Sequence, residues 1–352
     1  MIPIGNVYYM LAYAFRVLRQ SGYADLGSED FENADDLCAA ILERAVSHQL
    51  KRGLGRGYVP REDAIATVRG RIHVGESAKT LSTITGRLVC DYDEFSEDVP
   101  MNRVVKAAMR ALLGSPDVPV HRKGELRRLL PYFSGVREVN LRRADWRFRY
   151  DRNSKSYEML MFVCKLVADR AVQRDAAGRR GLAEFGDDQE ISRLYEKFIL
   201  AYYKREHPEL RSSAAQVPWA LDDGEGGMLP VMQTDVTLQQ GDRILIIDAK
   251  YYQSSLQQRY SARTVHSGNL YQIFAYVKNE QAALPSGAPP VSGMLLYAKT
   301  DEEVFPHNCY LMSGNPVEVR TLDLSGDFSS IKRQLDGIAE EHFAQPQTNE
   351  AM

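Results

Sequence analysis

The 352-residue sequence is poor in cysteine and has no long apolar run. Its four cysteines, Cys38, Cys90, Cys164 and Cys309, have no CxxC spacing and no nearby histidines, which argues against a structural zinc site. No segment approaches the roughly 18 apolar residues that a membrane-spanning helix needs. The apolar start, MIPIGNVYYMLAYAFRVL, lacks the basic leader and the cleavage site of a signal peptide. These absences predict reduced thiols, a cytoplasmic location and no membrane partner.

Several motifs of nucleotide-binding proteins and hydrolases are also absent. No GxxxxGK[ST] motif occurs, so we expect this chain to bind no nucleotide itself and to take any nucleotide-driven motor from a partner. The sequence contains neither HExxH nor GxSxG, which leaves the zinc protease and serine hydrolase classes without support. The net charge of -3 gives no overall attraction to nucleic acid.

The composition is that of a globular protein, with 44% apolar and 26% charged residues, and the length suits two domains. A polar, glycine-containing segment at about residues 174–190 predicts the boundary between them. The first helix should begin at Asn6, whose side chain suits an N-cap. The expected parts are an N-terminal helical domain (1–180) with a β-rich insert (about 58–95, including AIATVRGRIHV and RLVCDYDEF as strands), a second domain (181–345) and a frayed tail (346–352).

Helix and strand patterns alternate in the second domain. The patterns predict a helix at 190–206, strands near 214–220, 230–238 and 243–252, a helix at 268–280 and a strand at 292–298. Such an order indicates a central mixed sheet flanked by helices. The predicted fold class is therefore α/β, or α+β for the whole chain.

Two acids and a lysine occur on neighbouring strands of this predicted sheet. The segment LPVMQTDVTLQQGDRILIIDAKYY reads as a hairpin that turns at Gly241, with Asp235 on the first strand and Asp248 near the end of the second. The apolar run Ile244–Ile247 predicts a strand covered on both sides, and alternation places Asp248 and Lys250 on one face. The simplest alternative is a surface ion pair at a strand end.

Two carboxylates that converge at a strand end suit Mg2+, with Mn2+ as a second possibility. Such a metal lowers the pKa of a bound water, and the Lys250 ammonium is placed to hold that water or a phosphate oxygen. On the following helix Asn269, Gln272 and Tyr276 share one face, so Gln272 is a candidate site residue. On the preceding helix Glu196 borders a buried apolar stripe and is a candidate third carboxylate. Either side chain would also suit an ordinary helix position.

The order of these residues resembles the PD-(D/E)xK nuclease superfamily: a helix with Glu196, a strand with Asp235, a strand with Asp248-Ala249-Lys250, then a helix with Gln272. Gln272 and Tyr276 match the QxxxY element of its RecB-like branch. The sequence departs from the pattern at Thr234, where the superfamily has a proline. This departure leaves the metal role intact because proline contributes no ligand.

Four further stretches widen the resemblance to most of the chain. IPIGNVYYMLAYAF, RGRIHV, YDEFSEDVPMNRVVKAA and IIDAKYY followed by NLYQ together resemble the McrC subunit of McrBC-type modified-cytosine restriction systems. The resemblance implies a Mg2+-dependent DNA endonuclease subunit that stimulates the GTPase of an McrB-like AAA+ ring, which recognises double-stranded methylated DNA. It gives Asp235, Asp248, Lys250 and Gln272 catalytic places and makes Asp235, Asp248 and Glu196 the metal ligands. The alternatives are a non-catalytic scaffold that activates the GTPase and an autonomous RecB-like repair nuclease.

The N-terminal half offers two sets of candidate contact residues. The β-rich insert resembles the McrC region that engages the GTPase ring, which makes Arg69, Arg71 and Arg103 candidate partner contacts, although packing against neighbouring acids would explain them equally well. Between His121 and Arg149 there are nine Lys/Arg and three acids. This stretch makes Arg142 and Arg143 candidate DNA contacts, with a solvated surface as the alternative.

Overall fold

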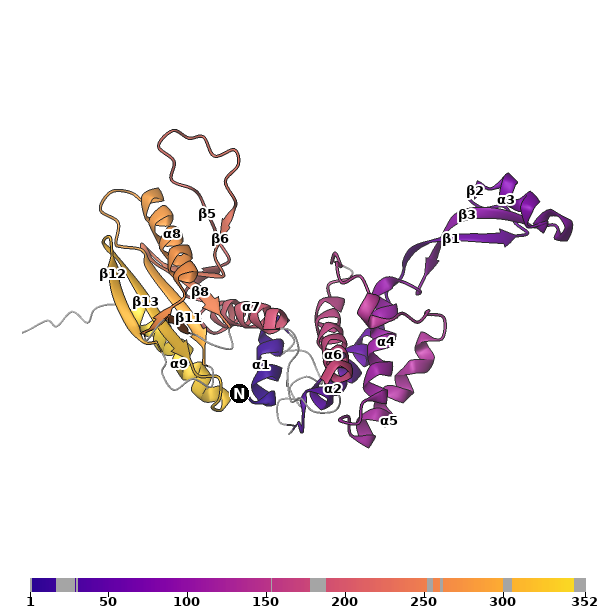
Figure 1. Ribbon diagram of the computed structural model, residues 1–352, viewed down its shortest axis with the longest axis horizontal. Coiled ribbons are helices and arrows are strands. Elements are labelled where there is room, and N and C mark those ends of the chain that lie inside the picture. Colours follow the sequence, from indigo (N-terminus) through magenta and orange to yellow (C-terminus); the bar gives the residue numbers. More distant parts are fainter. Residues whose placement is uncertain are drawn as a thin grey trace, which may run out of the picture. The chain divides into compact units, whose positions relative to one another are not determined.

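The computed structural model describes residues 2–16, 29, 31–152, 154–177, 188–251, 256–259, 262–299 and 306–344. The chain forms two compact units, one of Glu32–Glu184 and one of Met1–Phe31 with Phe185–Met352. Both combine helices and strands (Figure 1), so the α/β class predicted from the sequence is confirmed. The expected frayed tail lies outside the described residues. Among the described helices, none is long and apolar enough to cross a membrane.

The helical part of the Glu32–Glu184 unit is organised around buried ion pairs. Asn33 caps the first helix by accepting from the Asp36 backbone N–H. Asp35, in the first turn of that helix, is completely buried and accepts from Ser115 Oγ and Arg170 Nε. The main helices are α2 (Ala34–Arg52), α4 (Pro100–Gly114), α5 (Val120–Leu129) and α6 (Tyr157–Ala177), with short 3-10 turns at Leu130–Phe133 and Leu141–Arg143.

A small sheet is inserted between α2 and α4 (Figure 1). Strands β1 (Gly57–Ile65) and β3 (Leu88–Ser96) pair antiparallel along their whole length. Strand β3 coincides with the predicted strand RLVCDYDEF, whereas most of β1 precedes the predicted strand AIATVRGRIHV. The segment AIATVRGRIHV does not form the single predicted strand, because β1 ends at Ile65 and β2 (Arg71–Ile72) follows a turn at Gly70, where φ is +63°. Helix α3 (Val74–Lys79) and a 3-10 turn (Ser82–Thr85) complete the insert.

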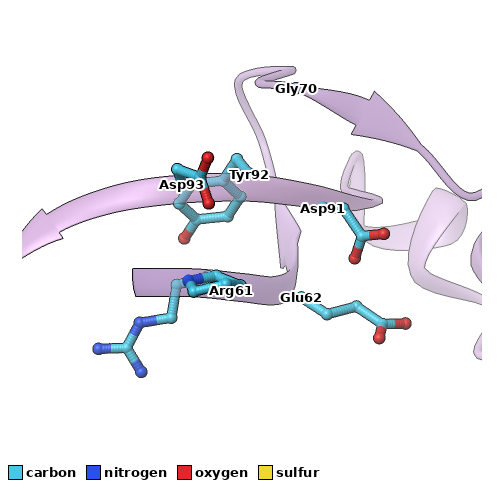
Figure 2. A pocket seen from close by; sticks show the side chains of 7 residues that line it. Arg61, Glu62, Gly70, Asp91, Tyr92 and Asp93 are labelled. Carbon is cyan, nitrogen blue, oxygen red and sulfur yellow. The ribbon is translucent and has the colours of Figure 1, made fainter. Parts of the chain in front are cut away.

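One face of the insert carries a shallow depression of about 520 Å³. Figure 2 shows Glu62 and Asp91 on adjacent strands, with Gly70 in the loop beside them. Glu62 lies directly opposite Asp91 in the register of β1 and β3, so the two side chains point to the same face. Asp91 also contacts His73 Nε2. The insert is therefore a largely exposed sheet, and this depression carries acidic side chains.

The second unit is built on a six-stranded mixed sheet in the order β12-β13-β11-β8-β7-β4. The central β8 pairs in parallel with β11 and antiparallel with β7, which buries its apolar run as predicted. Helix α8 (Ser267–Ala283) covers one face, and α7 (Asp188–Glu206) and α9 (Phe328–Phe343) pack on the other (Figure 1). The strands are β4 (Arg211–Ser213), β7 (Val236–Gln240), β8 (Arg243–Lys250), β11 (Ser292–Ala298), β12 (Asn308–Met312) and β13 (Asn315–Leu322).

The two strands predicted before β8 are each split in the structure. Residues 214–220 contribute only β5 (Gln216–Val217), which follows β4 after a short break. Residues 230–238 form β6 (Met232–Gln233), which pairs with β5, and the start of β7 in the main sheet. A further hairpin, β9 (Leu256–Arg259) with β10 (Ala262–Val265), lies between β8 and α8 in the sequence.

The first helix belongs with the second unit, in contrast to the predicted N-terminal domain of residues 1–180. Helix α1 spans Ile4–Ala14 and its N-cap is Pro3, so the prediction of an N-cap at Asn6 is wrong. Asn6 is buried inside the helix and donates from Nδ2 to the carbonyls of Leu324 and Gly326. These hydrogen bonds attach α1 to the segment before α9, a contact across more than 300 residues that local patterns do not contain.

Candidate functional site

The end of β8 carries two of the predicted site residues. Asp248, which is 1% exposed, and Lys250 project from the same face of the strand because side chains alternate. Val236, the first residue of β7, lies opposite Ile247 of β8, and Asp235 directly precedes this pair. Asp235 Oδ2 accepts a hydrogen bond of 2.9 Å from the Ala249 backbone N–H. The two carboxylates therefore meet where β8 ends and β7 begins, in the interior of the sheet.

The ammonium of Lys250 connects these acids to helix α8. Its Nζ lies 3.0 Å from Asp248 Oδ1 and 2.9 Å from Asp248 Oδ2, and it donates to Gln272 Oε1 at 3.3 Å. Gln272 Nε2 donates in turn to Tyr276 Oη at 2.8 Å. The structure thus brings Asp235, Asp248, Lys250 and Gln272 together as the sequence predicts, and their catalytic roles stay predictions.

Burial dominates the electrostatics of the two acids. Burial raises the pKa of Asp248 to about 7, with Asp235 adding to the increase and Lys250 opposing it. Burial also raises the pKa of Asp235, against the effects of Lys250 and of the hydrogen bond from the Ala249 N–H. A pair of acids with pKa values raised in this way is typical of functional sites, because the folded protein holds charge there at an energetic cost.

The donor set fits a hard divalent cation. Asp248 Oδ2 is buried and, within the described residues, accepts no aligned hydrogen bond, although it lies 2.9 Å from Lys250 Nζ. Such an oxygen retains a lone pair for a metal, and Mg2+ commonly binds through one or two carboxylates while water and phosphate oxygens complete its shell. The described part of the chain holds no group of three or more His, Cys, Asp or Glu arranged to bind a metal. Asp235 and Asp248 are therefore the candidate protein ligands.

The predicted third ligand, Glu196, lies near this pair but does not complete a three-carboxylate group. Its Oε1 accepts from Ser192 Oγ at 3.4 Å. Burial raises the pKa of Glu196, the charge of Asp235 adds to the increase, and Lys250 opposes it. The charges of Asp235 and Lys250 thus act on Glu196, and its role as a ligand stays a prediction.

Two residues that the sequence analysis did not assign to the site support it from β11. Tyr297 is adjacent to Lys250 in the parallel register, and its hydroxyl accepts from Asn269 Nδ2 at 2.8 Å. Gly293 lies opposite Ile246 and directly under α8, where an added Cβ would be 2.7 Å from Val277 Cγ2. A side chain at this position would push α8, and Gln272 with it, away from the sheet. Neither role has a local sequence signal.

The remaining candidates lie in the Glu32–Glu184 unit. Arg69 and Arg71 are exposed on the insert, and Arg142 and Arg143 are exposed on the 3-10 turn Leu141–Arg143. Arg103 is different, because its side chain is only 17% exposed and its Nε donates to Asp98 Oδ1 at 2.7 Å. The alternative interpretation of Arg103, packing against a neighbouring acid, is therefore the one that its geometry favours.

Comparisons with known proteins extend over both units. A family model described as McrBC 5-methylcytosine restriction system component matches residues 6–298. The type IV methyl-directed restriction enzyme EcoKMcrBC of Escherichia coli (strain K12) is 27% identical over 349 residues, which are 97% of this chain and 98% of the relative.

Two solved structures from Thermococcus gammatolerans are similar at lower levels. McrB AAA+ hexamers with bound McrC match 96% of this chain and 76% of the other at 18% identity and a TM-score of 0.47. The McrBC complex matches 58% of each chain at 19% identity and a TM-score of 0.41. Because the family model matches well over half of the sequence, the chain belongs to the family of McrBC 5-methylcytosine restriction system components.

Proposed function

We propose that this chain is the Mg2+-dependent DNA endonuclease subunit of a GTP-driven, methylcytosine-dependent restriction complex. The observation that carries the proposal is the meeting of Asp235, Asp248 and Lys250 at the end of the buried central strand β8. Two acids and an ammonium in this arrangement suit the hydrolysis of a phosphodiester. Membership of a restriction-system family supports DNA as the substrate.

The chain's own residues would act by holding and orienting the reacting groups. Asp235 and Asp248 would hold Mg2+, or Mn2+ in its place, and a bound cation would supply an acidified water and neutralise charge on the phosphate. Lys250 is placed to hold the attacking water or a phosphate oxygen, because its ammonium contacts Asp248 at the same strand end. Gln272, itself fixed by Tyr276, limits the movement of that ammonium.

The insert is the proposed docking surface for an McrB-like AAA+ GTPase. Its large apolar side chains are unusually exposed, and clusters of this kind often mark protein interaction sites. The exposed fractions are 75% for Tyr58, 73% for Val74, 61% for Leu81, 77% for Ile84 and 58% for Phe95. The exposed Arg69 and Arg71 lie on the same insert. We also propose that this contact stimulates GTP hydrolysis, and that Arg142 and Arg143 contact DNA.

Replacing Gly70 by alanine should weaken the stimulation of GTP hydrolysis and leave the nuclease unit intact. Gly70 has φ of +63°, and an added Cβ would be 2.0 Å from the Asp91 carbonyl oxygen. The left-handed conformation alone costs an alanine about 1 kcal/mol or more, and the clash forces β2 away from β3. GTP hydrolysis by the partner, measured against the concentration of this chain, should require several-fold more of the variant.

Gly75→Ala is the matched control. Gly75 lies in α3 of the same insert, and an added Cβ meets no atom within 4 Å. This variant should stimulate the GTPase like wild type. Equal stimulation by Gly70→Ala and wild type would contradict a docking role for the β2–β3 edge.

The proposed function is tested by replacing Asp235, Asp248 and Lys250 singly by alanine. Each variant is mixed with the partner GTPase and methylated duplex DNA, and cleavage and GTP hydrolysis are measured in the same reaction. Loss of cleavage with GTP hydrolysis still stimulated supports the proposal. Unchanged cleavage in all three variants contradicts it and favours a scaffold role. Efficient cutting by the purified chain with Mg2+ alone would instead favour an autonomous nuclease.

A further inference from the structure

Asp235 lies in the short break between β6 and β7, where the chain has one more residue than the segment that faces it. Ser213 of β4 lies opposite Thr237 of β7, and Gln216 of β5 lies opposite Gln233 of β6. Between these two pairs, residues 214–215 on one strand face residues 234–236 on the other. Three residues opposite two define a β-bulge, a device that bends a strand and redirects a side chain and that is common beside active sites. Asp235 is the middle residue of the three.

Thr234 holds this bulge with both its backbone and its side chain. Its N–H donates to the Ala215 carbonyl at 2.9 Å, and its Oγ1 accepts from the Ala215 N–H at 3.0 Å. The hydroxyl therefore occupies the acceptor position that a backbone carbonyl has in a regular antiparallel pair. Thr234 Oγ1 also lies 2.8 Å from Thr237 Oγ1, on the far side of Asp235. Both threonines are buried, so these bonds form away from water.

The bulge lies where the chain leaves its pairing with β8. Val236 is the first residue of β7 that pairs with β8, opposite Ile247, and Asp235, one residue earlier, accepts from the Ala249 N–H through its Oδ2. In a regular strand the direction of the Asp235 side chain would follow from simple alternation with Val236, whereas the extra residue of a bulge allows that side chain to be redirected. The position of the Asp235 carboxylate therefore depends on the local contacts of Thr234.

We propose that Thr234 is a positioning residue for the metal site, which fixes the Asp235 carboxylate beside Asp248 by stabilising the bulge. This inference rests on the proposed function, since it concerns the same two carboxylates. Proline, the superfamily residue at this position, has no N–H to donate to the Ala215 carbonyl and no hydroxyl to accept from the Ala215 N–H. In this chain threonine and proline are therefore not equivalent, although neither would bind the metal.

The experiment compares Thr234→Val, Thr234→Ser and Thr234→Pro in the full-length chain. Valine has the shape of threonine and retains the N–H but loses the hydroxyl, whereas serine retains both. Binding of Mn2+ to the purified chain is measured by titration calorimetry. The Mn2+ dissociation constant should rise by about 10- to 100-fold in Thr234→Val, as when residues that orient a metal ligand are replaced. Thr234→Ser should remain within a few-fold of wild type, and Thr234→Pro should bind Mn2+ at least as weakly as Thr234→Val.

Thermal unfolding shows whether each variant is folded. Thr237→Val provides a second variant in case Thr234→Val does not fold. It removes the Thr237 Oγ1 contact and leaves the Ala215 bonds of Thr234 in place. A weaker affinity for Mn2+ in a folded Thr237→Val or Thr234→Val supports the proposal, together with rescue by serine. Wild-type affinity in the folded variants, or binding by Thr234→Pro as tight as wild type, overturns it.

Cleavage by the complex separates this inference from the proposed function. Suppose that Asp248→Ala abolishes cleavage, while Thr234→Val needs no more metal than the wild-type chain to cut DNA. Only the role proposed for Thr234 is then wrong. If Asp248→Ala cuts like wild type, the proposed function itself is wrong, whatever Thr234→Val does.

Discussion

Replacing Asp248 by asparagine is expected to reduce DNA cleavage by the complex roughly 1,000-fold while GTP hydrolysis continues. The substitution keeps the shape of the side chain but removes the buried negative charge that faces Lys250 and the proposed metal. An amide binds a divalent cation more weakly than a carboxylate does, and its NH2 group cannot accept from the ammonium. The rate at which DNA is cut, measured alongside GTP hydrolysis in the same reaction, provides the test.

The same substitution should make the metal-free protein more stable at neutral and alkaline pH. Burial raises the pKa of Asp248 to about 7, whereas an unfolded aspartate titrates near pH 4. Between about pH 4 and 7 the folded chain retains a proton that the unfolded chain has lost, so its stability falls as the pH rises through this window. The amide of the substituted side chain does not titrate, so the variant escapes this loss. Thermal unfolding in a chelator at pH 8 should therefore shift upward, by about 2–4 °C for each kcal/mol gained.

Asp242→Asn is the matched control for both measurements. Asp242 is exposed in the turn between β7 and β8, so the change removes an equal charge from the same hairpin without touching the site. Cleavage and stability should both stay at wild-type levels in this variant. A loss of cleavage in Asp248→Asn accompanied by lower stability at pH 8 would mean that Asp248 is a structural anchor, which contradicts its assignment as a metal ligand.

The geometry of the site could be predicted wherever it depended on local patterns. The apolar run Ile244–Ile247 identified a strand buried on both faces, and alternation then placed Asp248 and Lys250 together at its end. The spacing of Gln272 and Tyr276 correctly placed them within reach of each other on one helix. In each case the contacts follow from the repeat of a single element, which a sequence displays directly.

Features that depend on distant contacts or on a single extra residue could not be predicted in this way. Asn6 has the properties of an N-cap, but its partners are carbonyls more than 300 residues away. The bulge at Asp235 arises from a one-residue mismatch between two strand pairs, which no local pattern reveals. Beyond residue 299, strands β12 and β13 and helix α9 were not predicted. The two strands form one side of the sheet, and α9 packs against it.

The same limitation applies to Arg103, which the sequence suggested as a partner contact. The sequence shows an acid five residues earlier, but not that this acid is buried. In the structure Asp98 is 1% exposed and accepts hydrogen bonds from Arg103, from the Arg137 side chain and from the Arg137 backbone N–H. Arg61 Nη2 lies 3.7 Å from the same carboxylate. One acid therefore joins β1 of the insert to α4 and to the segment after α5.

Replacing Asp98 by alanine should destabilise the Glu32–Glu184 unit by about 3–5 kcal/mol, because it leaves the largely buried guanidinium of Arg103 without its acid. Burial alone would raise the pKa of Asp98, but hydrogen bonds from Arg103 and Arg137 outweigh it and hold that pKa below its usual value. A depressed pKa means that this stabilisation is present above about pH 4 and is lost as the solution becomes more acidic. Denaturant unfolding, followed with hydrogen exchange of the β1 and β3 amides, measures both effects.

Glu138→Gln is the control for this prediction, since its ion pair with Arg110 is more than half exposed on both sides and should contribute little. Asp98→Ala should also weaken the stimulation of GTP hydrolysis, because β1 loses its connection to α4. The affinity of the chain for Mn2+ should not change, since Asp235 and Asp248 belong to the other unit. If Asp98→Ala lowered Mn2+ affinity as strongly as Thr234→Val, the assignment of docking and cleavage to separate units of this chain would be wrong.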